Sequence, residues 1–224
     1  GVKKTGVHLK VATDRLRLYR FGEFGTSPGA IQFKEVLLMS KDKPIPTTAP
    51  AMVGEKIYLR PATAEDIANT YHWLLLSDPW SRTCRPIPYR TATQVGEAFK
   101  KREASPYEQP FMVVRKKDNV PVGKVSFFDF NTQNRSAELG LMVDPEEREN
   151  GYGLAALRLL CRHLFKTRGL NKVYAQTASF NKAAQGLMKK AGFKLDGTLR
   201  HHYFYEGEYY DGLVYSLLAF EFNE

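Results

Sequence analysis

The chain has 224 residues, of which 43% are hydrophobic and 25% are charged, and its net charge is +9. This composition is that of a soluble globular protein and excludes collagen-like and low-complexity chains. No apolar run approaches the roughly 20 residues of a membrane-spanning helix, and no signal peptide is visible. We therefore expect a cytoplasmic protein that does not bind membranes.

The basic charge is distributed unevenly along the chain. Residues 1–53 contain nine Lys or Arg and four Asp or Glu, a net charge of +5, so the remaining residues carry +4. That smaller excess suits an anionic cofactor. No motif of basic residues interleaved with aromatic ones appears, so we predict no nucleic-acid partner. The two cysteines, Cys84 and Cys161, form neither a disulfide framework nor a metal-binding pattern.

The first 53 residues are predicted to form an N-terminal extension. Residues 16–21 and 31–34 alternate apolar and polar side chains, which favours two short strands. Residues 40–53 contain three prolines, which is typical of a semi-extended linker. The main domain then runs from residue 54 to residue 224. The extension could be the tail of an upstream domain, a dimerisation arm or an added edge of the main sheet, so a homodimer is one of the alternatives.

The first half of the main domain begins with a strand and a helix. Residues 56–60 predict the strand, and Thr63 with Asp66 forms a capping box for a helix that extends through Leu75. The elements predicted after this helix are a Pro-rich loop at 78–90, a helix from Thr93 to Phe99, and a hairpin of strands 111–116 and 120–129.

The second half is organised around a long helix with an apolar stripe. This stripe consists of Leu154, Leu157, Leu160, Cys161, Leu164 and Phe165, and a buried free thiol is expected at Cys161. The predicted elements are strand 136–143, the long helix ending near Gly169, strand 173–177, helix 182–191, and hairpin strands 193–199 and 209–220.

The turn between strand 136–143 and the long helix has a distinctive pattern. The strand breaks at Asp144-Pro145, and the chain then reads Arg148-x-x-Gly151-x-Gly153 before the helix begins. Glycines at a helix N-terminus let phosphate approach bare backbone N–H groups, and the helix dipole favours the negative charge. The pattern is neither a GxxxxGK[ST] loop nor GxGxxG. It therefore predicts a phosphate-binding turn of another kind.

This turn resembles the acetyl-CoA signature of the GNAT superfamily of N-acetyltransferases. A second match is Asn181-x-x-Ala-x-x-Leu followed by Gly192-Phe193. A third, Gly197-Thr-Leu-Arg200 with Glu-Gly and Asp211 downstream, resembles the branch that modifies ribosomal-protein N-termini, polyamines and antibiotics. The three motifs occur in the family's order and extend the resemblance from Gly54 to the C-terminus.

The resemblance implies an α/β fold with a mixed, mostly antiparallel twisted sheet of about seven strands and helices on both faces. The sheet should splay beside the glycine turn to admit the pantetheine arm. The implied activity is transfer of an acetyl group from acetyl-CoA to a primary amine, by direct attack in a ternary complex and without a metal. The acceptor would be a protein or peptide N-terminus, an antibiotic or amino-sugar amine, or another small-molecule amine.

The resemblance also assigns cofactor residues. Arg148, Gly151 and Gly153 would hold the pyrophosphate, with backbone N–H groups of residues 149–154 as donors. The acidic Glu149 should point outward or weaken binding. Asn181 would cap its helix, contact pantetheine, or do both. The full predicted cofactor set is Leu141, Met142, Val143, Arg148, Glu149, Asn150, Gly151, Tyr152, Gly153, Leu154 and Asn181.

Glu138 is the first candidate for the general base, because it matches a strand glutamate that several relatives use. The alternative is a structural glutamate that pairs with a neighbouring strand. His201 is a second catalytic candidate, and strand alternation allows at most one of His201 and His202 to face the site. Many relatives have a Tyr acid where this chain has Met188, which cannot donate a proton. Tyr203, Tyr209 and Tyr210 are the candidates to replace it.

In the family, the loop that corresponds to residues 78–90 forms one wall of the acceptor site. The predicted substrate-binding residues are Trp80, Arg82, Arg85, Tyr89, Tyr203 and Tyr209. The alternative for this loop is a Trp80 packed on the core and solvated arginines. The basic loop favours an acceptor with phosphate or carboxylate and makes a polyamine the least favoured acceptor.

A rival hypothesis is a non-catalytic acyl-CoA-binding module that regulates a fused partner. Glu138 argues against this hypothesis, and Met188 argues weakly for it.

Overall fold

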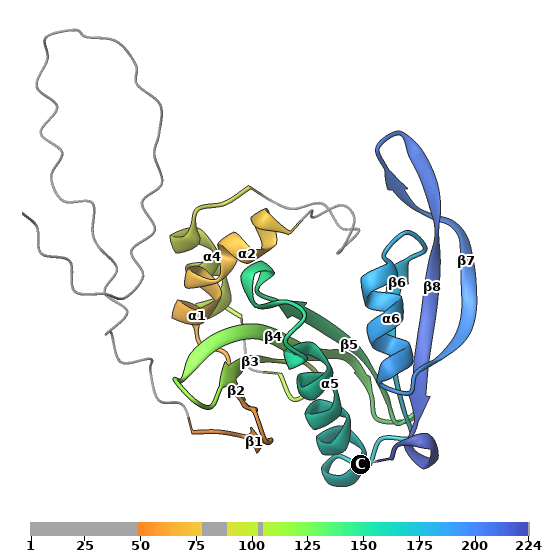
Figure 1. Cartoon of the computed structure of the whole chain (residues 1–224), viewed down its shortest axis with the longest axis horizontal. Coiled ribbons are helices and arrows are strands. Elements are labelled where there is room, and N and C mark those ends of the chain that lie inside the picture. Colours follow the sequence, from red (N-terminus) through yellow and green to blue (C-terminus); the bar gives the residue numbers. More distant parts are fainter. Residues whose placement is uncertain (1–48, 78–88, 103–104, 224) are drawn as a thin grey trace, which may run out of the picture. The chain divides into compact units, whose positions relative to one another are not determined.

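The computed structural model describes residues 49–77, 89–102 and 105–223 (Figure 1). The two strands predicted before residue 35, and the predicted loop contacts of Trp80, Arg82 and Arg85, lie outside these residues.

An eight-stranded sheet forms the centre of the described part, one strand more than the seven or so predicted. The strands are β1 (Met52–Val53), β2 (Ile57–Pro61), β3 (Gln109–Arg115), β4 (Val120–Asn131), β5 (Ser136–Val143), β6 (Lys172–Ala178), β7 (Lys194–Tyr205) and β8 (Glu208–Leu218). Their order is β1-β2-β3-β4-β5-β6-β8-β7, and β5–β6 is the parallel pair in an otherwise antiparallel sheet. The predicted mixed, mostly antiparallel α/β fold is confirmed.

The extra strand, β1, lies in the segment predicted to be a linker. Met52 is opposite Leu59 of β2, and the N–H of Ala51 donates to the Leu59 carbonyl at 2.8 Å. Gly54 donates to the Ile57 carbonyl at 2.9 Å, which closes the tight turn between the two strands. The linker prediction is therefore wrong for its last residues, because strand pairing begins two residues before the predicted boundary at 54.

The helices and short turns are α1 (Ala64–Asn69), α2 (Tyr71–Leu76), α4 (Ala92–Lys100), η1 (Pro145–Glu147), α5 (Tyr152–Arg162), η2 (His163–Thr167), α6 (Lys182–Lys190) and η3 (Ala219–Glu221). The capping box of Thr63 and Asp66 is confirmed at the start of α1. The predicted continuous helix through Leu75 is wrong, since it breaks at Thr70, whose hydroxyl donates to the Asp66 carbonyl at 2.6 Å.

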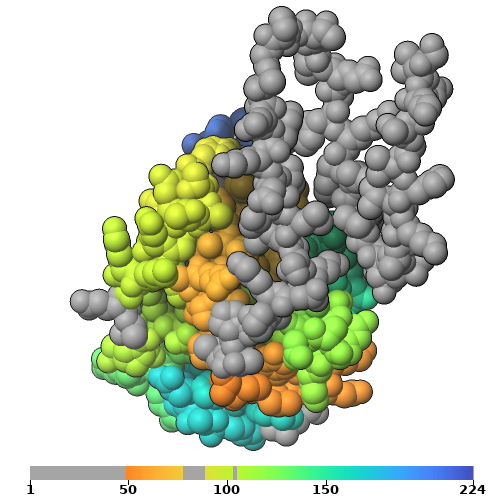
Figure 2. All heavy atoms as spheres, turned by 90° about the vertical axis from the view of Figure 1, so that its left-hand side faces the viewer, coloured from red at the N-terminus to blue at the C-terminus, as the bar shows by residue number. Residues whose placement is uncertain are grey.

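The second predicted helix begins two residues earlier than expected. Thr91, and not Thr93, is the N-cap of α4, because its hydroxyl accepts from the N–H of Gln94 while the Gln94 side chain accepts from the N–H of Thr91. This helix packs closely on α1. A Cβ atom at Gly96 would lie 3.1 Å from the Ala64 carbonyl oxygen. The residues of α1 and α4, orange and yellow, lie on one side of the molecule (Figure 2).

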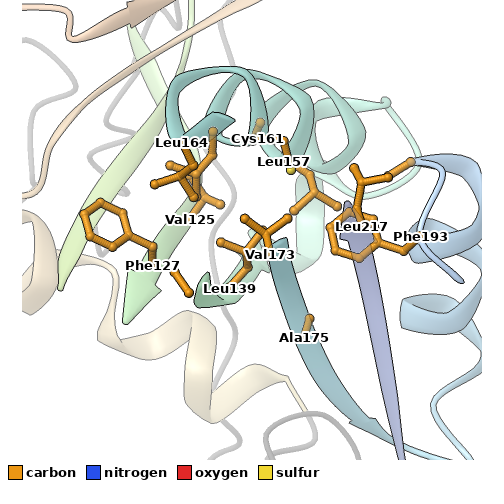
Figure 3. Packing of buried hydrophobic residues seen from close by; sticks show 14 of the residues in the cluster. Val125, Phe127, Leu139, Leu157, Cys161, Leu164, Val173, Ala175, Phe193 and Leu217 are labelled. Carbon is orange, nitrogen blue, oxygen red and sulfur yellow. The ribbon is translucent and has the colours of Figure 1, made fainter. Parts of the chain in front are cut away.

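Strand alternation divides the sheet into two packed faces. On one face, α5 covers the central strands, and Leu157, Cys161 and Leu164 point toward them (Figure 3). Cys161 is a buried free thiol, as predicted. On the other face, Trp73 of α2 packs on Met112 and Val114 of β3. Helices therefore cover both faces, as predicted.

The parallel pair β5–β6 opens partway along its length. Its pairs are Ser136 with Lys172, Ala137 with Val173, and Glu138 with Tyr174. Beyond Glu138, β5 continues to Val143 and β6 to Ala178, but these parts of the two strands do not pair with each other. The sheet therefore splays at Glu138, on the side that leads to the glycine turn, as predicted.

The C-terminal hairpin is longer than predicted, because β7 continues to Tyr205. Its pairing with β8 is irregular between Leu199 and Tyr203, where His201 has a φ of 49°. Across the described ranges, no helix is both long and apolar enough to cross a membrane.

Candidate active site

The turn between β5 and α5 presents an uncapped helix N-terminus. Gly151 is the N-cap of α5, has a φ of 79° and offers no side-chain hydrogen bond. The first-turn N–H groups of a helix have no partner within the helix, so they are available to a ligand. Glu149, with a φ of 66°, is exposed, in agreement with the expected outward orientation.

Arg148 connects this turn to the end of α2. Its Nη2 donates to the hydroxyl of the buried Ser77 at 2.8 Å. The guanidinium therefore helps to fix the turn against the helical face that carries Trp73. A contact of Arg148 with pyrophosphate stays a prediction.

Gly153 is buried where α5 approaches β5. A Cβ atom at this position would lie 3.2 Å from a Val143 methyl group and 3.4 Å from a Leu141 methyl group. The side chains of Leu141 and Val143 thus pack under the helix, while their backbone lies in the part of β5 that is paired with β4 but not with β6. Gly153 has a packing role in addition to any role toward phosphate.

A basic groove of about 470 Å³ borders the phosphate turn. It is lined by Glu55, Lys56, Arg115, Lys116, Lys117, Asn150 and Tyr152. Arg115 is paired with Asp118 and with Glu147, at 2.8 and 2.7 Å, so the lysines supply most of the positive charge that is not neutralised by pairing. Sequence reasoning missed this groove, because the lysines belong to the β1–β2 and β3–β4 turns, which meet the helix only in the folded chain.

Two residues beside the splay fit the pantetheine arm. Asn181 caps α6 through Oδ1, which accepts from the N–H of Ala184 at 3.2 Å, and this leaves its Nδ2 as a donor. The hydroxyl of Thr177 in β6 is buried and has no hydrogen-bond partner among the described residues. A buried hydroxyl of this kind costs stability unless a ligand completes its hydrogen bond. The donor set therefore suits an amide-rich chain such as pantetheine.

Glu138 lies at the point where the sheet opens, beside a tyrosine and a second carboxylate. Tyr174 is its partner in β6, and the Tyr174 hydroxyl donates to Asp129. Burial, that hydrogen bond and the charges of Asp129 and Glu138 raise the pKa of Tyr174. Asp129 has a φ of 49° in the irregular part of β4, which turns its side chain toward β6. Simple alternation along β4 could not predict this cluster.

We call the side of β4 and β5 that faces α2 the acceptor face, and it consists of Lys124, Ser126, Phe128, Glu138, Gly140 and Met142. Gly140 has no side chain to fill the middle of the acceptor face. A Cβ atom there would lie 2.9 Å from the Ser126 hydroxyl and 3.2 Å from the Phe128 ring. The open edge of β5 thus runs beside a shallow floor that leads to Glu138.

His201 lies in a different groove from Glu138. It lines a groove of about 780 Å³ with Thr198, Leu199, Arg200, His202 and Asp211. The irregular pairing of β7 breaks strand alternation, so both histidines line this groove, against the expectation that at most one would face a site. The strand order puts β7 three strand spacings from β5, which is about 14 Å. The structure therefore does not bring His201 beside Glu138.

The predicted tyrosines are dispersed. Tyr89 is 84% exposed, and Tyr209 is 61% exposed and stacks on His201. Tyr203 is partly buried and contacts His202. Tyr210 packs edge-on against Phe180, with ring centres 4.7 Å apart, and Phe180 directly precedes Asn181. Of the three general-acid candidates, Tyr210 is the one that contacts Phe180, the residue directly before Asn181 at the predicted pantetheine site.

Comparison with known proteins finds N-acetyltransferases of the same fold. A family model described as "Acetyltransferase (GNAT) domain" matches residues 56–194. The uncharacterized N-acetyltransferase YoaA of Bacillus subtilis is 30% identical over 97 residues, which are 43% of this chain and 55% of that protein. Spermidine N(1)-acetyltransferase of Escherichia coli is 26% identical over 156 residues, 70% of this chain and 82% of that protein.

A solved structure of spermidine N-acetyltransferase from Vibrio cholerae, in complex with CoA and spermine, has the same fold. Its TM-score is 0.68 at 23% identity, over 74% of this chain and 97% of that chain. Within the described residues, no group of three His, Cys, Asp or Glu side chains is placed to hold a metal ion.

Proposed function

Since the chain belongs to the GNAT acetyltransferases, enzymes that transfer an acetyl group from acetyl-CoA to an amine, we propose that its acceptor amine reacts beside Glu138 on the acceptor face. The splay at Glu138 carries this proposal. It opens a gap between β5 and β6 that starts at the proposed base and ends at the phosphate turn, so one extended ligand can reach both.

The proposed division of labour follows the gap from end to end. The first-turn N–H groups at Gly151 hold the pyrophosphate, and the lysines of the basic groove add positive charge. Thr177 and Asn181 hydrogen-bond the pantetheine arm. The β6-facing side of the β5 backbone beyond Glu138, which has no strand partner there, positions the thioester next to the acceptor face.

Acetyl-CoA supplies an activated acyl group and a thiol leaving group. An alkylammonium is almost entirely protonated at neutral pH, so the chain must remove a proton before attack. Glu138 takes that proton, directly or through water. The hydrogen bond from Tyr174 to Asp129 fixes the position of β6 beside Glu138. A thiol pKa of about 8.5 lets a thiolate leave with little assistance, so the missing tyrosine at Met188 is no barrier to turnover.

The acceptor is proposed to be a primary amine carried by a small molecule or a peptide. Some relatives are named as spermidine acetyltransferases, which act on an amine of this small-molecule class, and the carboxylates of Asp129 and Glu138 would attract the ammonium group of the reacting amine. The non-catalytic alternative is disfavoured, because Glu138 lies at the splay, where a base is needed.

Glu138→Gln tests this proposal, because it keeps the shape of the side chain and removes its basicity. Turnover of acetyl-CoA with an amine panel, followed by CoA release, should fall roughly 100-fold. Binding of acetyl-CoA by calorimetry should stay within about threefold of the wild-type value, since Glu138 lies five residues before the end of β5 and the proposed phosphate site follows that end. The pH–rate profile should also lose its acidic limb.

The matched control is Glu97→Gln on the exposed side of α4. It should leave turnover and pH profile unchanged. Wild-type turnover in Glu138→Gln would mean that the glutamate is structural and that another group, or water, removes the proton.

A further inference from the structure

Lys124 of β4 is a partly buried cation among apolar side chains on the acceptor face. It is opposite Met112 of β3 and Met142 of β5, and its ammonium nitrogen lies 5.7 Å from the centre of the Trp73 ring. Burial lowers its pKa from 10.5 to about 8, and attraction to Asp66 offsets only part of this effect. A desolvated cation costs stability, so its position invites a functional explanation.

Asp66 is already bound by other groups. Arg60 of β2 donates to both carboxylate oxygens, at 2.6 and 2.7 Å, and Thr63 donates through its N–H and its hydroxyl. Within residues 49–77, 89–102 and 105–223, no carboxylate forms an ion pair with Lys124. The ammonium can therefore pair with an anion that a ligand brings.

A continuous strip of the acceptor face connects Lys124 with Glu138. Along it, Lys124 is opposite Met142, Ser126 is opposite Gly140, and Phe128 is opposite Glu138. Four residues of strand correspond to about 13 Å between the two ends. Because the amine and the anion would each lie a hydrogen-bond length inside these two ends, they would be roughly 10 Å apart.

We propose that Lys124 selects the acceptor by binding an anionic group, a carboxylate or a phosphate, at the end opposite to the reacting amine. This inference rests on the proposed function, since that function places the amine at Glu138. A polyamine of similar length would bring a second ammonium group to Lys124. Repulsion between like charges in a desolvated place disfavours that ligand.

Four probes of matched length test the selection. They are 8-aminooctanoate, 8-aminooctyl phosphate, octylamine and 1,8-diaminooctane, and their binding to the full-length protein saturated with CoA is measured by calorimetry. At least one anionic probe should bind ten times more tightly than octylamine, and the diamine should bind most weakly. The tighter of the two anionic probes identifies the anion as carboxylate or phosphate.

Lys124→Met removes the charge and fits the methionines on both sides of it. The anionic probes should lose at least tenfold in affinity, while octylamine should change less than threefold. Lys100→Met, at an exposed lysine in the last turn of α4, is the control and should alter none of these values.

The inference is overturned if wild-type protein binds octylamine or the diamine as tightly as the anionic probes, if it binds no anionic probe, or if the preference survives Lys124→Met. Release of CoA from acetyl-CoA with the same probes is measured separately. Absence of turnover together with a Lys124-dependent preference would reject the proposed function and leave the anion site standing.

Discussion

Arg60 of β2 and Lys124 of β4 lie on the same face of the sheet, one strand apart, but the two cations are stabilised to different degrees. Arg60 is 1% exposed, and its hydrogen bonds to Asp66 raise its pKa. Burial opposes ionisation of Asp66, but the bonds from Arg60 and Thr63 outweigh it and lower the Asp66 pKa. Removing either partner would leave an unpaired buried charge, which is strongly destabilising. This pair holds α1 on the sheet, whereas Lys124 has no such structural partner in the described part of the chain.

The lowered pKa of Lys124 predicts a pH-dependent stability difference. Between pH 8 and 10.5 the unfolded chain binds a proton at this lysine that the folded chain does not, so stability rises with pH in that window. Below pH 8 both states are protonated, and the folded state carries the full cost of up to about 3 kcal/mol. Lys124→Met should therefore be more stable than wild type at pH 7, and this advantage should shrink as the pH rises toward 10.

Urea unfolding at pH 7 and pH 9.5 measures this difference, with Lys100→Met as the exposed-lysine control. The charged groups around Lys124 are Asp66 and its partner Arg60, and neither titrates in this window, because one pKa is lowered and the other is raised. A stability difference that is the same at both pH values would show that Lys124 is not desolvated.

At the scale of elements, the glycines of the phosphate turn have different roles. Gly151 adopts a left-handed conformation, and nothing lies within 4 Å of a Cβ atom placed there. Gly153 is an ordinary helical residue in contact with Val143 and Leu141. A bulky substitution at Gly153 would thus disturb the packing of α5 on β5 as well as any bound phosphate, so Gly151 is the cleaner position for a test.

Gly151→Asp should weaken acetyl-CoA binding at least tenfold, about 1.4 kcal/mol, because it places a negative charge where the pyrophosphate is proposed to bind. Asp tolerates a left-handed conformation better than most residues, and a negative charge suits a helix N-terminus, so the free energy of unfolding should change by less than about 1 kcal/mol. Calorimetry and thermal unfolding measure the two effects.

Gly151→Asn has a similar shape without the charge and should weaken binding less than Gly151→Asp. Equal loss in both variants would indicate a steric effect, and unchanged affinity in both would place the phosphates elsewhere.

The elements with strong local signals could be predicted, and those that depend on distant contacts could not. The apolar stripe of α5, the capping box of Thr63 and the strand 136–143 were all correct, because each follows from nearby residues. The break at Thr70 coincides with hydrogen bonds from its hydroxyl and its N–H to the Asp66 carbonyl, which the sequence pattern does not indicate. The cluster of Glu138, Asp129 and Tyr174 depends on an irregular β4 and on strands far apart in sequence. In the site, motifs therefore indicate the phosphate turn and Glu138, but not Lys124, Thr177 or the basic groove.

At the scale of the whole molecule, the sheet has β1 at one edge and β7 at the other. β1 is two residues long, yet Met52 packs against the main core and Ala51 hydrogen-bonds to Leu59. The turn at Gly54 also lies against α5, since a Cβ atom there would be 3.0 Å from a Leu159 methyl group. The edge strand thus joins β2 to the helix that forms the phosphate turn.

This arrangement predicts where the N-terminal segment can be removed. A chain that starts at residue 49 keeps β1, and it should bind acetyl-CoA within about threefold of the full-length affinity, because every described residue of the proposed site is retained. A chain that starts at residue 54 loses the Met52 contacts and the hydrogen bond of Ala51, which together contribute about 1–3 kcal/mol. It should therefore unfold at a temperature several degrees lower.

Thermal unfolding and calorimetry on the two truncated chains and the full-length protein separate these effects. Equal stability of the two truncated chains would show that β1 adds nothing, and lost binding in the chain from residue 49 would assign part of the site to residues 1–48.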